Sequence, residues 1–85
     1  MTKLIFYTKP DCPLCEKAFV VVKKTKKRTD FQLEIRDITQ DKVLFEKYCF
    51  DIPIIELNGV IRFRGRVTEE ELGAALLNNL RRPDL

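Results

Sequence analysis

The residues best suited to covalent chemistry are Cys12 and Cys15, two of the three cysteines in the chain, which enclose a proline and a leucine. Thiolates attack disulfides and form them reversibly, so two neighbouring thiols can exchange an electron pair with a substrate. Residues three apart on a helix lie about 5–6 Å from each other, close enough for a disulfide after slight adjustment of the first turn. The motif follows an apolar run and opens a predicted helix within a βαβ pattern, which is the setting of a redox pair.

The two cysteines are predicted to play unequal parts. Cys12 stands at the helix start, where unpaired backbone N–H groups and the helix dipole favour thiolate and lower cysteine pKa values to roughly 3.5–7.5. Lys9 adds positive charge nearby, and Asp11 acts against it. Cys15 lies one turn further in. We therefore expect Cys12 to attack a disulfide and Cys15 to resolve the mixed disulfide that results.

Metal binding is the competing use of these thiols. A zinc or iron–sulfur centre generally needs about four soft ligands, whereas the chain has three cysteines and no histidine. No metal site is predicted within one chain, and a site shared between subunits stays open. A non-enzymatic adaptor, or a module that handles metal or iron–sulfur clusters, is accordingly the alternative function. Cys49, just after the second predicted helix, is interpreted as a small buried packing residue, with a regulatory or intersubunit thiol as the alternative.

Composition places the chain among ordinary soluble domains. Its 85 residues are 45% hydrophobic and 34% charged, which predicts one domain over residues 1–85. The longest N-terminal apolar run is too short for a signal peptide or a membrane span, so a cytoplasmic location is expected. The net charge of +3 comes largely from a basic run in residues 23–28. We interpret this run as a solvated helix end, because no aromatic residues alternate with it as a nucleic-acid platform needs.

Strand signals alternate with helix signals along the chain. Continuous apolar residues at 4–7 predict a central strand, and a helix is predicted from Cys12 or Pro13 to about Lys27. Alternation at residues 31–36 predicts an edge strand, and Thr39 is predicted to cap a helix over 40–48. The inward face of the first helix is expected to comprise Leu14, Ala18, Val21, Val22 and Thr25.

The last third of the chain predicts a hairpin followed by a helix. Asn58-Gly59 joins a strand over 52–57 to a strand in which Ile61 and Phe63 alternate with arginines. Thr68 and Glu71 form a capping box for the final helix. Its apolar stripe is expected to comprise Leu72, Ala75, Leu76 and Leu80. The order βαβαββα predicts an α/β fold in which a right-handed parallel crossover and an antiparallel hairpin build a four-stranded mixed sheet with helices on both faces.

Several of these segments together resemble a glutaredoxin. They are residues 9–15, Ile52-Pro53 and Gly65 before the last helix. The chain as a whole is similar to the compact, largely uncharacterised bacterial glutaredoxin-like proteins of the thioredoxin superfamily, whose marks also include Tyr48 and Gly65-Arg66. The resemblance implies a thioredoxin-like fold, a cis peptide before Pro53, and Cys12 as the nucleophile.

The resemblance also implies contacts with glutathione or another disulfide substrate. The residues that would make them are Lys9, Pro13, Leu14, Ile52, Pro53, Gly65 and Arg66. Asp51 departs from the small hydroxylated residue usual in glutaredoxins, and its charge is expected to repel an anionic tripeptide. The redox chemistry is therefore expected to carry over to this chain better than glutathione specificity.

The sequence thus predicts a thiol–disulfide oxidoreductase that reduces protein or low-molecular-weight disulfides. The chemistry needs no bound cofactor, and the electrons are expected from glutathione or from a flavoprotein disulfide reductase. We expect a monomer that binds neither nucleic acid nor membrane.

Overall fold

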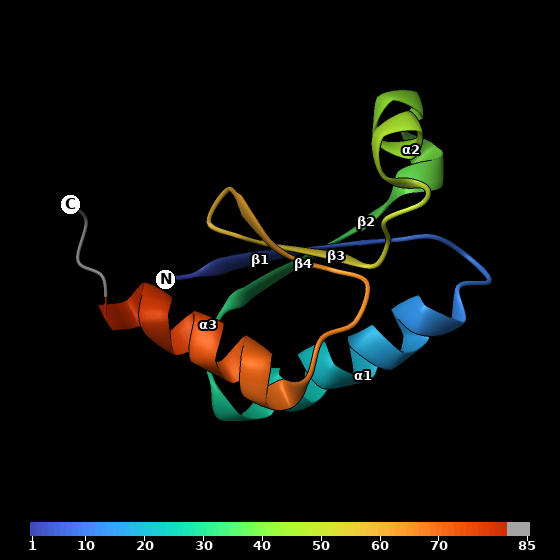
Figure 1. Cartoon of the computed structure of the whole chain (residues 1–85). Coiled ribbons are helices and arrows are strands. Elements are labelled where there is room, and N and C mark those ends of the chain that lie inside the picture. The colour runs from blue at the N-terminus through green and yellow to red at the C-terminus, as the bar shows by residue number, and fades with distance from the viewer. Residues whose placement is uncertain (82–85) are drawn as a thin grey trace.

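The computed structural model describes residues 1–81, in which three helices and four strands follow the predicted order βαβαββα, with one additional 3-10 turn. Figure 1 labels the main elements. Their bounds are β1 Lys3–Thr8, α1 Pro13–Arg28, β2 Gln32–Asp37, the 3-10 turn Ile38–Gln40, α2 Lys42–Tyr48, β3 Ile54–Leu57, β4 Val60–Arg64 and α3 Glu69–Arg81.

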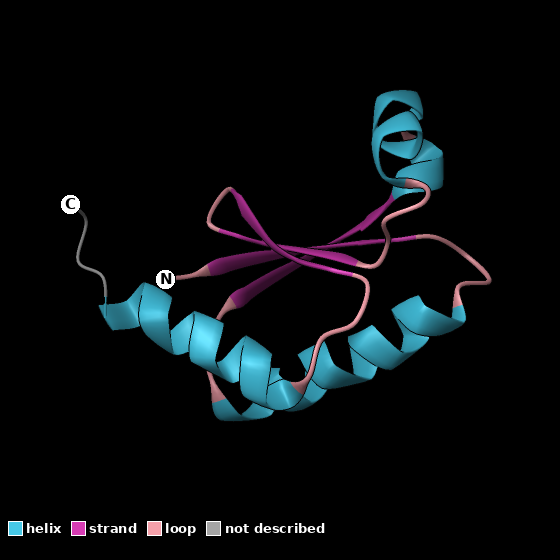
Figure 2. Cartoon of the chain, viewed as in Figure 1, coloured by secondary structure: helices cyan, strands magenta, loops and turns pink. Residues whose placement is uncertain are grey.

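The four strands form one mixed sheet in the order β2-β1-β3-β4. β1 runs parallel to β2 and antiparallel to β3, and β3 pairs with β4 as an antiparallel hairpin. Helices α1 and α3 cover one face of the sheet and α2 lies on the other (Figures 1 and 2). This is a thioredoxin-like arrangement, as predicted, with β2 at one edge and β4 at the other.

The core lies mainly between the sheet and the α1–α3 layer. Leu4 and Phe6 of β1 point into it and are almost fully buried. On α1, Ala18 and Val22 are buried as expected. Leu14 was expected on the same inward face but is 45% exposed, which corrects that prediction. Helical register allows either residue on this face, since Cys15 and Leu14 lie three and four positions before Ala18, and in the structure the first turn buries Cys15, which is 2% exposed.

The start of α2 also differs from the prediction. Thr39 lies in the 3-10 turn, where its N–H and hydroxyl both donate to the Asp37 carboxylate. Asp41 is the N-cap of α2 instead, and its carboxylate accepts from the N–H groups of Val43 and Leu44 at 2.9 and 3.1 Å. The helix begins at Lys42 because aspartate caps a helix as well as threonine does and Thr39 is already engaged.

The hairpin and the final helix follow the sequence signals closely. Asn58 and Gly59 both have positive φ, 48° and 86°, as a tight two-residue hairpin turn requires. Thr68 and Glu71 exchange the reciprocal hydrogen bonds of a capping box at 3.0 and 3.1 Å. The predicted apolar stripe on α3 has four members, of which three are buried; the structure does not describe the side chain of the fourth. The buried members are Leu72, Ala75 and Leu76, and the fourth is Leu80.

Candidate active site

Cys12 and Cys15 lie at the N-terminus of α1 and are joined by a disulfide, with their Cα atoms 5.2 Å apart. Cys12 is the N-cap residue, in an extended conformation, and Pro13 begins the helix. The Cys15 N–H donates to the Cys12 Sγ atom at 3.2 Å. A backbone donor and the positive end of the helix dipole are thus directed at this sulfur, which is the arrangement that favours thiolate once the disulfide is reduced.

The two sulfur-bearing residues differ in exposure as well as in position. Cys15 is 2% exposed and belongs to the hydrophobic core, whereas Cys12 is half-buried. The preceding turn passes through Asp11, which adopts a positive φ of 57° that aspartate tolerates better than bulky residues do. The geometry gives a substrate access to Cys12 first and holds Cys15 one turn behind it.

The peptide between Ile52 and Pro53 is cis, as the resemblance implies. The Ile52 N–H donates to the Tyr48 carbonyl at the end of α2, and the Gly65 N–H donates to the Pro53 carbonyl at 2.7 Å. These bonds tie the Ile52–Pro53 segment to α2 and to the loop before α3. Because its N–H is engaged, Ile52 has its carbonyl rather than its N–H to offer an extended substrate.

Asp51 is paired with Arg64, with 3.2 Å between Oδ2 and Nη1. The sequence suggests an uncompensated negative charge at this position. The guanidinium instead balances it, although a half-exposed pair of this kind contributes only about 0–1 kcal/mol to stability. Repulsion of an anionic substrate by Asp51 is therefore weaker than the sequence indicates.

Two cavities flank the first half of α1. The first, of about 300 Å³, lies on the β2 side of the helix and includes both redox cysteines in its wall. We call it the β2-side cavity, and its lining residues are Phe6, Thr8, Lys9, Pro10, Asp11, Cys12, Cys15, Glu16, Phe19 and Ile35. The second, of about 330 Å³, is bordered by α1 and the loop before α3, with lining residues that include Leu14, Lys17 and Arg66.

The predicted substrate contacts are thus divided between two sides of the helix. Lys9 borders the β2-side cavity, and Leu14 and Arg66 border the second. The other four do not line either of these two cavities; they are Pro13, Ile52, Pro53 and Gly65. Sequence reasoning missed Phe19 and Ile35. Phe19 follows Cys15 by one helical turn, which is a signal that the sequence itself contains. Ile35 pairs with buried Phe6, and that signal depends on knowing the register of the sheet.

Cys49 is a free, half-buried thiol at the C-cap of α2. Its side chain packs against the hydrophobic core. This contact favours the interpretation of Cys49 as a packing residue.

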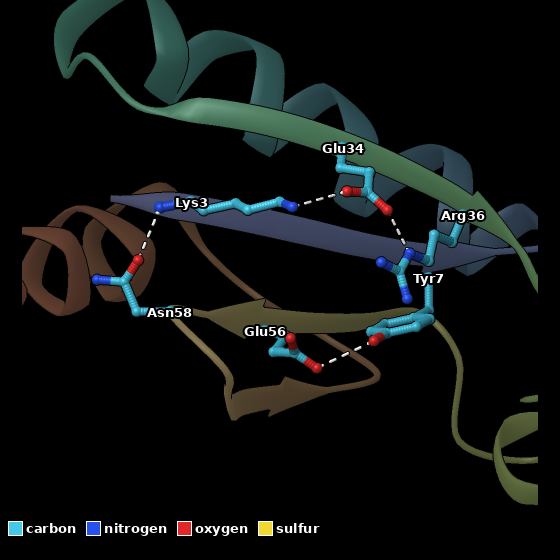
Figure 3. A network of polar contacts seen from close by, with 6 residues as sticks. All are labelled: Lys3, Tyr7, Glu34, Arg36, Glu56 and Asn58. Carbon is cyan, nitrogen blue, oxygen red and sulfur yellow. Dashed lines mark hydrogen bonds and ion pairs between the residues drawn. The ribbon is translucent and has the colours of Figure 1, made fainter. Parts of the chain in front are cut away.

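A network of polar contacts lies on the α2 face of the sheet, opposite the face that α1 and α3 cover (Figure 3). The Tyr7 hydroxyl donates to the Glu56 carboxylate at 2.9 Å. Burial, and then this hydrogen bond to a carboxylate, raise the pKa of Tyr7 to about 12. Nearby, Glu34 binds both Lys3 and Arg36, and the hydrogen bond from Arg36 is the main cause that lowers the pKa of the Glu34 carboxyl.

The Tyr7 phenol makes stability depend on pH in the alkaline range. The unfolded chain loses this proton near pH 10 and the folded chain near pH 12, so the contribution to the free energy of unfolding is complete below pH 10 and is lost as pH rises to about 12. Urea unfolding between pH 8 and 12 is expected to show a steeper alkaline loss in the wild type than in Tyr7→Phe. Parallel pH profiles for the two proteins would contradict this assignment.

Two features do not occur in the part of the chain that the structure describes. Residues 1–81 contain no cluster of three or more histidine, cysteine or acidic side chains placed to hold a metal ion. No helix in the same range has the length and apolar character needed to cross a membrane.

The fold and the cysteine pair define a redox protein of the thioredoxin-like class. Residues 3–77 match the family of glutaredoxin-like domains. The chain belongs to this glutaredoxin-like family. Among relatives, it is 36% identical over 73 residues to a protein of Methanothermobacter thermautotrophicus named "Probable Thioredoxin", with 82% of this chain and 86% of the relative covered.

Solved structures share the architecture. A Nitrosomonas europaea protein of known solution structure superposes with a TM-score of 0.75 at 23% identity, covering 88% of this chain and 91% of its own. Reduced desulfothioredoxin from Desulfovibrio vulgaris Hildenborough superposes with a TM-score of 0.69, also at 23% identity, covering 92% of this chain and 80% of its own. These similarities establish the thioredoxin-like fold.

Proposed function

We propose that the protein is a thiol–disulfide oxidoreductase that reduces disulfides through Cys12 and Cys15. The observation that carries this proposal is the contrast between the two thiols. Cys12 is the accessible N-cap sulfur that accepts the Cys15 N–H, and Cys15 is 2% exposed beside it. An accessible thiol stabilised as thiolate is suited to attack, and a buried neighbour is suited to resolve the product.

The reaction balances as two successive exchanges. The Cys12 thiolate attacks one sulfur of a substrate disulfide, forms a mixed disulfide and expels the other sulfur as a thiolate that takes up a proton. The Cys15 thiolate then attacks the Cys12 sulfur and expels the second substrate thiolate. The substrate gains two electrons, and the protein is left with the Cys12–Cys15 disulfide that a separate thiol reductant must reduce.

We propose glutathione or a flavoprotein disulfide reductase as that reductant, in a reducing compartment such as the cytoplasm. Membership of the glutaredoxin-like family supports the first donor, and the name "Probable Thioredoxin" of a relative supports the second. The positive charges of Lys17 and Arg66, which line the second cavity, support an anionic donor such as glutathione on that side of α1, and the predicted contact at Lys9 belongs to the same proposal. The predicted contacts at Pro13, Leu14, Ile52, Pro53 and Gly65 belong to the same proposal.

A coupled assay tests the proposal, with a small-molecule disulfide as acceptor and NADPH oxidation as the readout. One arm supplies glutathione with glutathione reductase, and the other supplies thioredoxin reductase. Turnover above background is expected in at least one arm. The absence of turnover in both would contradict the oxidoreductase and favour a non-enzymatic adaptor.

If glutathione is the donor, Arg66→Gln is expected to raise its KM about fivefold, the effect of losing a partly exposed charge contact of about 1 kcal/mol. Arg62→Gln is the matched control. Arg62 is an exposed arginine of β4 that contacts Asn79 of α3, so its loss is expected to leave the KM unchanged. Equal effects of the two substitutions would show that Arg66 does not contact glutathione.

A further inference from the structure

The β2-side cavity brings an apolar wall next to both redox sulfurs. Phe6, Phe19 and Ile35 supply that wall, and Cys12 and Cys15 border the same space. Phe19 of α1 packs on Phe6 of β1 with 5.6 Å between their ring centroids. Because β2 and β4 lie at opposite edges of the sheet, this cavity is on the side of α1 away from the loop before α3.

Ile35 is the exposed part of this wall. It pairs with Phe6 across the parallel β1–β2 ladder, and both side chains therefore point toward the α1 face of the sheet. Phe6 is 1% exposed, whereas Ile35 is 51% exposed. β2 is an edge strand, and α1 packs over Phe6 without covering its neighbour. The apolar surface beside the disulfide is thus available to a partner, and covering it removes apolar area from water, which favours binding.

We propose that the β2-side cavity binds an apolar side chain that flanks the reactive cysteine of a disulfide-containing protein substrate. This inference rests on the proposed function and names the substrate class of the same site. The exchange reaction brings a substrate sulfur to Cys12, which is itself part of the cavity wall. Consecutive Cα atoms are 3.8 Å apart, so the residue next to the substrate cysteine lies beside the cavity that Cys12 borders, whose lining also includes Phe19 and Ile35.

The charged residues that line the β2-side cavity favour an apolar side chain of a protein substrate over a small anionic thiol. Asp11 and Glu16 carry two negative charges there, and Lys9 carries one positive charge. Glutathione has two carboxylates, one ammonium group and no large apolar side chain, so it complements neither the wall nor the excess negative charge. A protein segment with a leucine or an aromatic residue beside its cysteine complements the wall.

Two disulfide-linked peptides that differ only in the residue next to the cysteine, leucine or serine, test the inference. The wild type is expected to favour the leucine peptide about tenfold in kcat/KM, which is within the discrimination that an apolar pocket provides. Ile35→Glu, which places a charge in the wall, is expected to reduce this ratio to below about twofold. A ratio near one in the wild type, or an unchanged ratio in Ile35→Glu, overturns the inference.

Val60→Glu is the matched control. Val60 is also a β-branched apolar residue on an edge strand, it is 58% exposed, and it lies on β4 at the opposite edge from β2. This variant is expected to keep the tenfold ratio. Loss of the ratio in Val60→Glu would assign the effect to net charge and would overturn the role of the cavity.

A binding experiment separates this inference from the proposed function. A leucine peptide that carries serine in place of its cysteine cannot react, and it is titrated into the oxidised protein while amide NMR shifts are followed. The largest shifts are expected at Phe19 and Ile35, and shifts confined to Leu14 and Arg66 would overturn the inference. Activity on a small disulfide with no preference between peptides would contradict only this inference, whereas inactivity on every disulfide would contradict the proposed function.

Discussion

Cys12→Ser is expected to lower disulfide reduction to the rate measured without protein. Serine keeps the N-cap and accepts the Cys15 N–H much as the sulfur does, so the helix should remain intact. The hydroxyl does not form the nucleophile that thiol–disulfide exchange requires, because only a thiolate attacks a disulfide at a useful rate. The measurement is NADPH-coupled turnover with a small disulfide, together with circular dichroism to verify the fold.

Cys15→Ser is expected to behave differently from Cys12→Ser. The first exchange still occurs at Cys12, but the resolving thiol is gone, and the mixed disulfide should accumulate as an adduct detectable by mass. Turnover that persists with glutathione would indicate a monothiol route in which glutathione resolves the adduct. Complete loss of turnover would indicate obligatory exchange between Cys12 and Cys15.

Cys49→Ser is the control for both substitutions. This thiol lies at the end of α2 and packs against the core outside the active-site turn, so its removal is expected to leave turnover unchanged. Full activity in Cys12→Ser, or inactivation by Cys49→Ser alone, would contradict the assignment of the nucleophile.

Several of the correct predictions come from signals contained within a few residues. Asn58-Gly59 requires only its own two backbone conformations to form a hairpin turn, and Thr68 and Glu71 satisfy each other across one helical turn. The N-cap position of Cys12 is of the same kind, because Pro13 favours the first turn of a helix. These features formed as expected because their partners lie close in sequence.

The incorrect or missing predictions depend on competition or on distant partners. Thr39 and Asp41 were both able to cap α2, and the contact between Thr39 and Asp37 decided between them. The charge of Asp51 is balanced by Arg64, which lies 13 residues further along the chain. The exposed wall at Ile35 follows from the position of β2 at the sheet edge. The edge position itself was predicted from the alternation at residues 31–36, but how far α1 covers Ile35 depends on tertiary packing that periodicity alone does not supply.

Phe6→Ala is expected to cause the largest loss of stability among single substitutions in the core. Phe6 lies in the middle of β1, is 1% exposed, and contacts Phe19 of the helix that carries the redox pair. Replacing a buried phenylalanine by alanine costs about 3–5 kcal/mol, of a total stability of about 5–15 kcal/mol for a small domain. Urea unfolding followed by circular dichroism measures the change in the free energy of unfolding. Thermal unfolding is expected to show a fall in Tm of more than about 10 °C.

Phe50→Ala provides the control for Phe6→Ala because it removes the same atoms from a side chain that is 97% exposed. Its free energy of unfolding is expected to stay within about 0.5 kcal/mol of the wild type. Similar losses from the two substitutions would contradict the burial assigned to Phe6.

Phe6 also lines the β2-side cavity, so at temperatures where Phe6→Ala is still folded, the preference for the leucine peptide should change as well. Phe50→Ala, by contrast, should leave the preference intact, since Phe50 is not part of that wall.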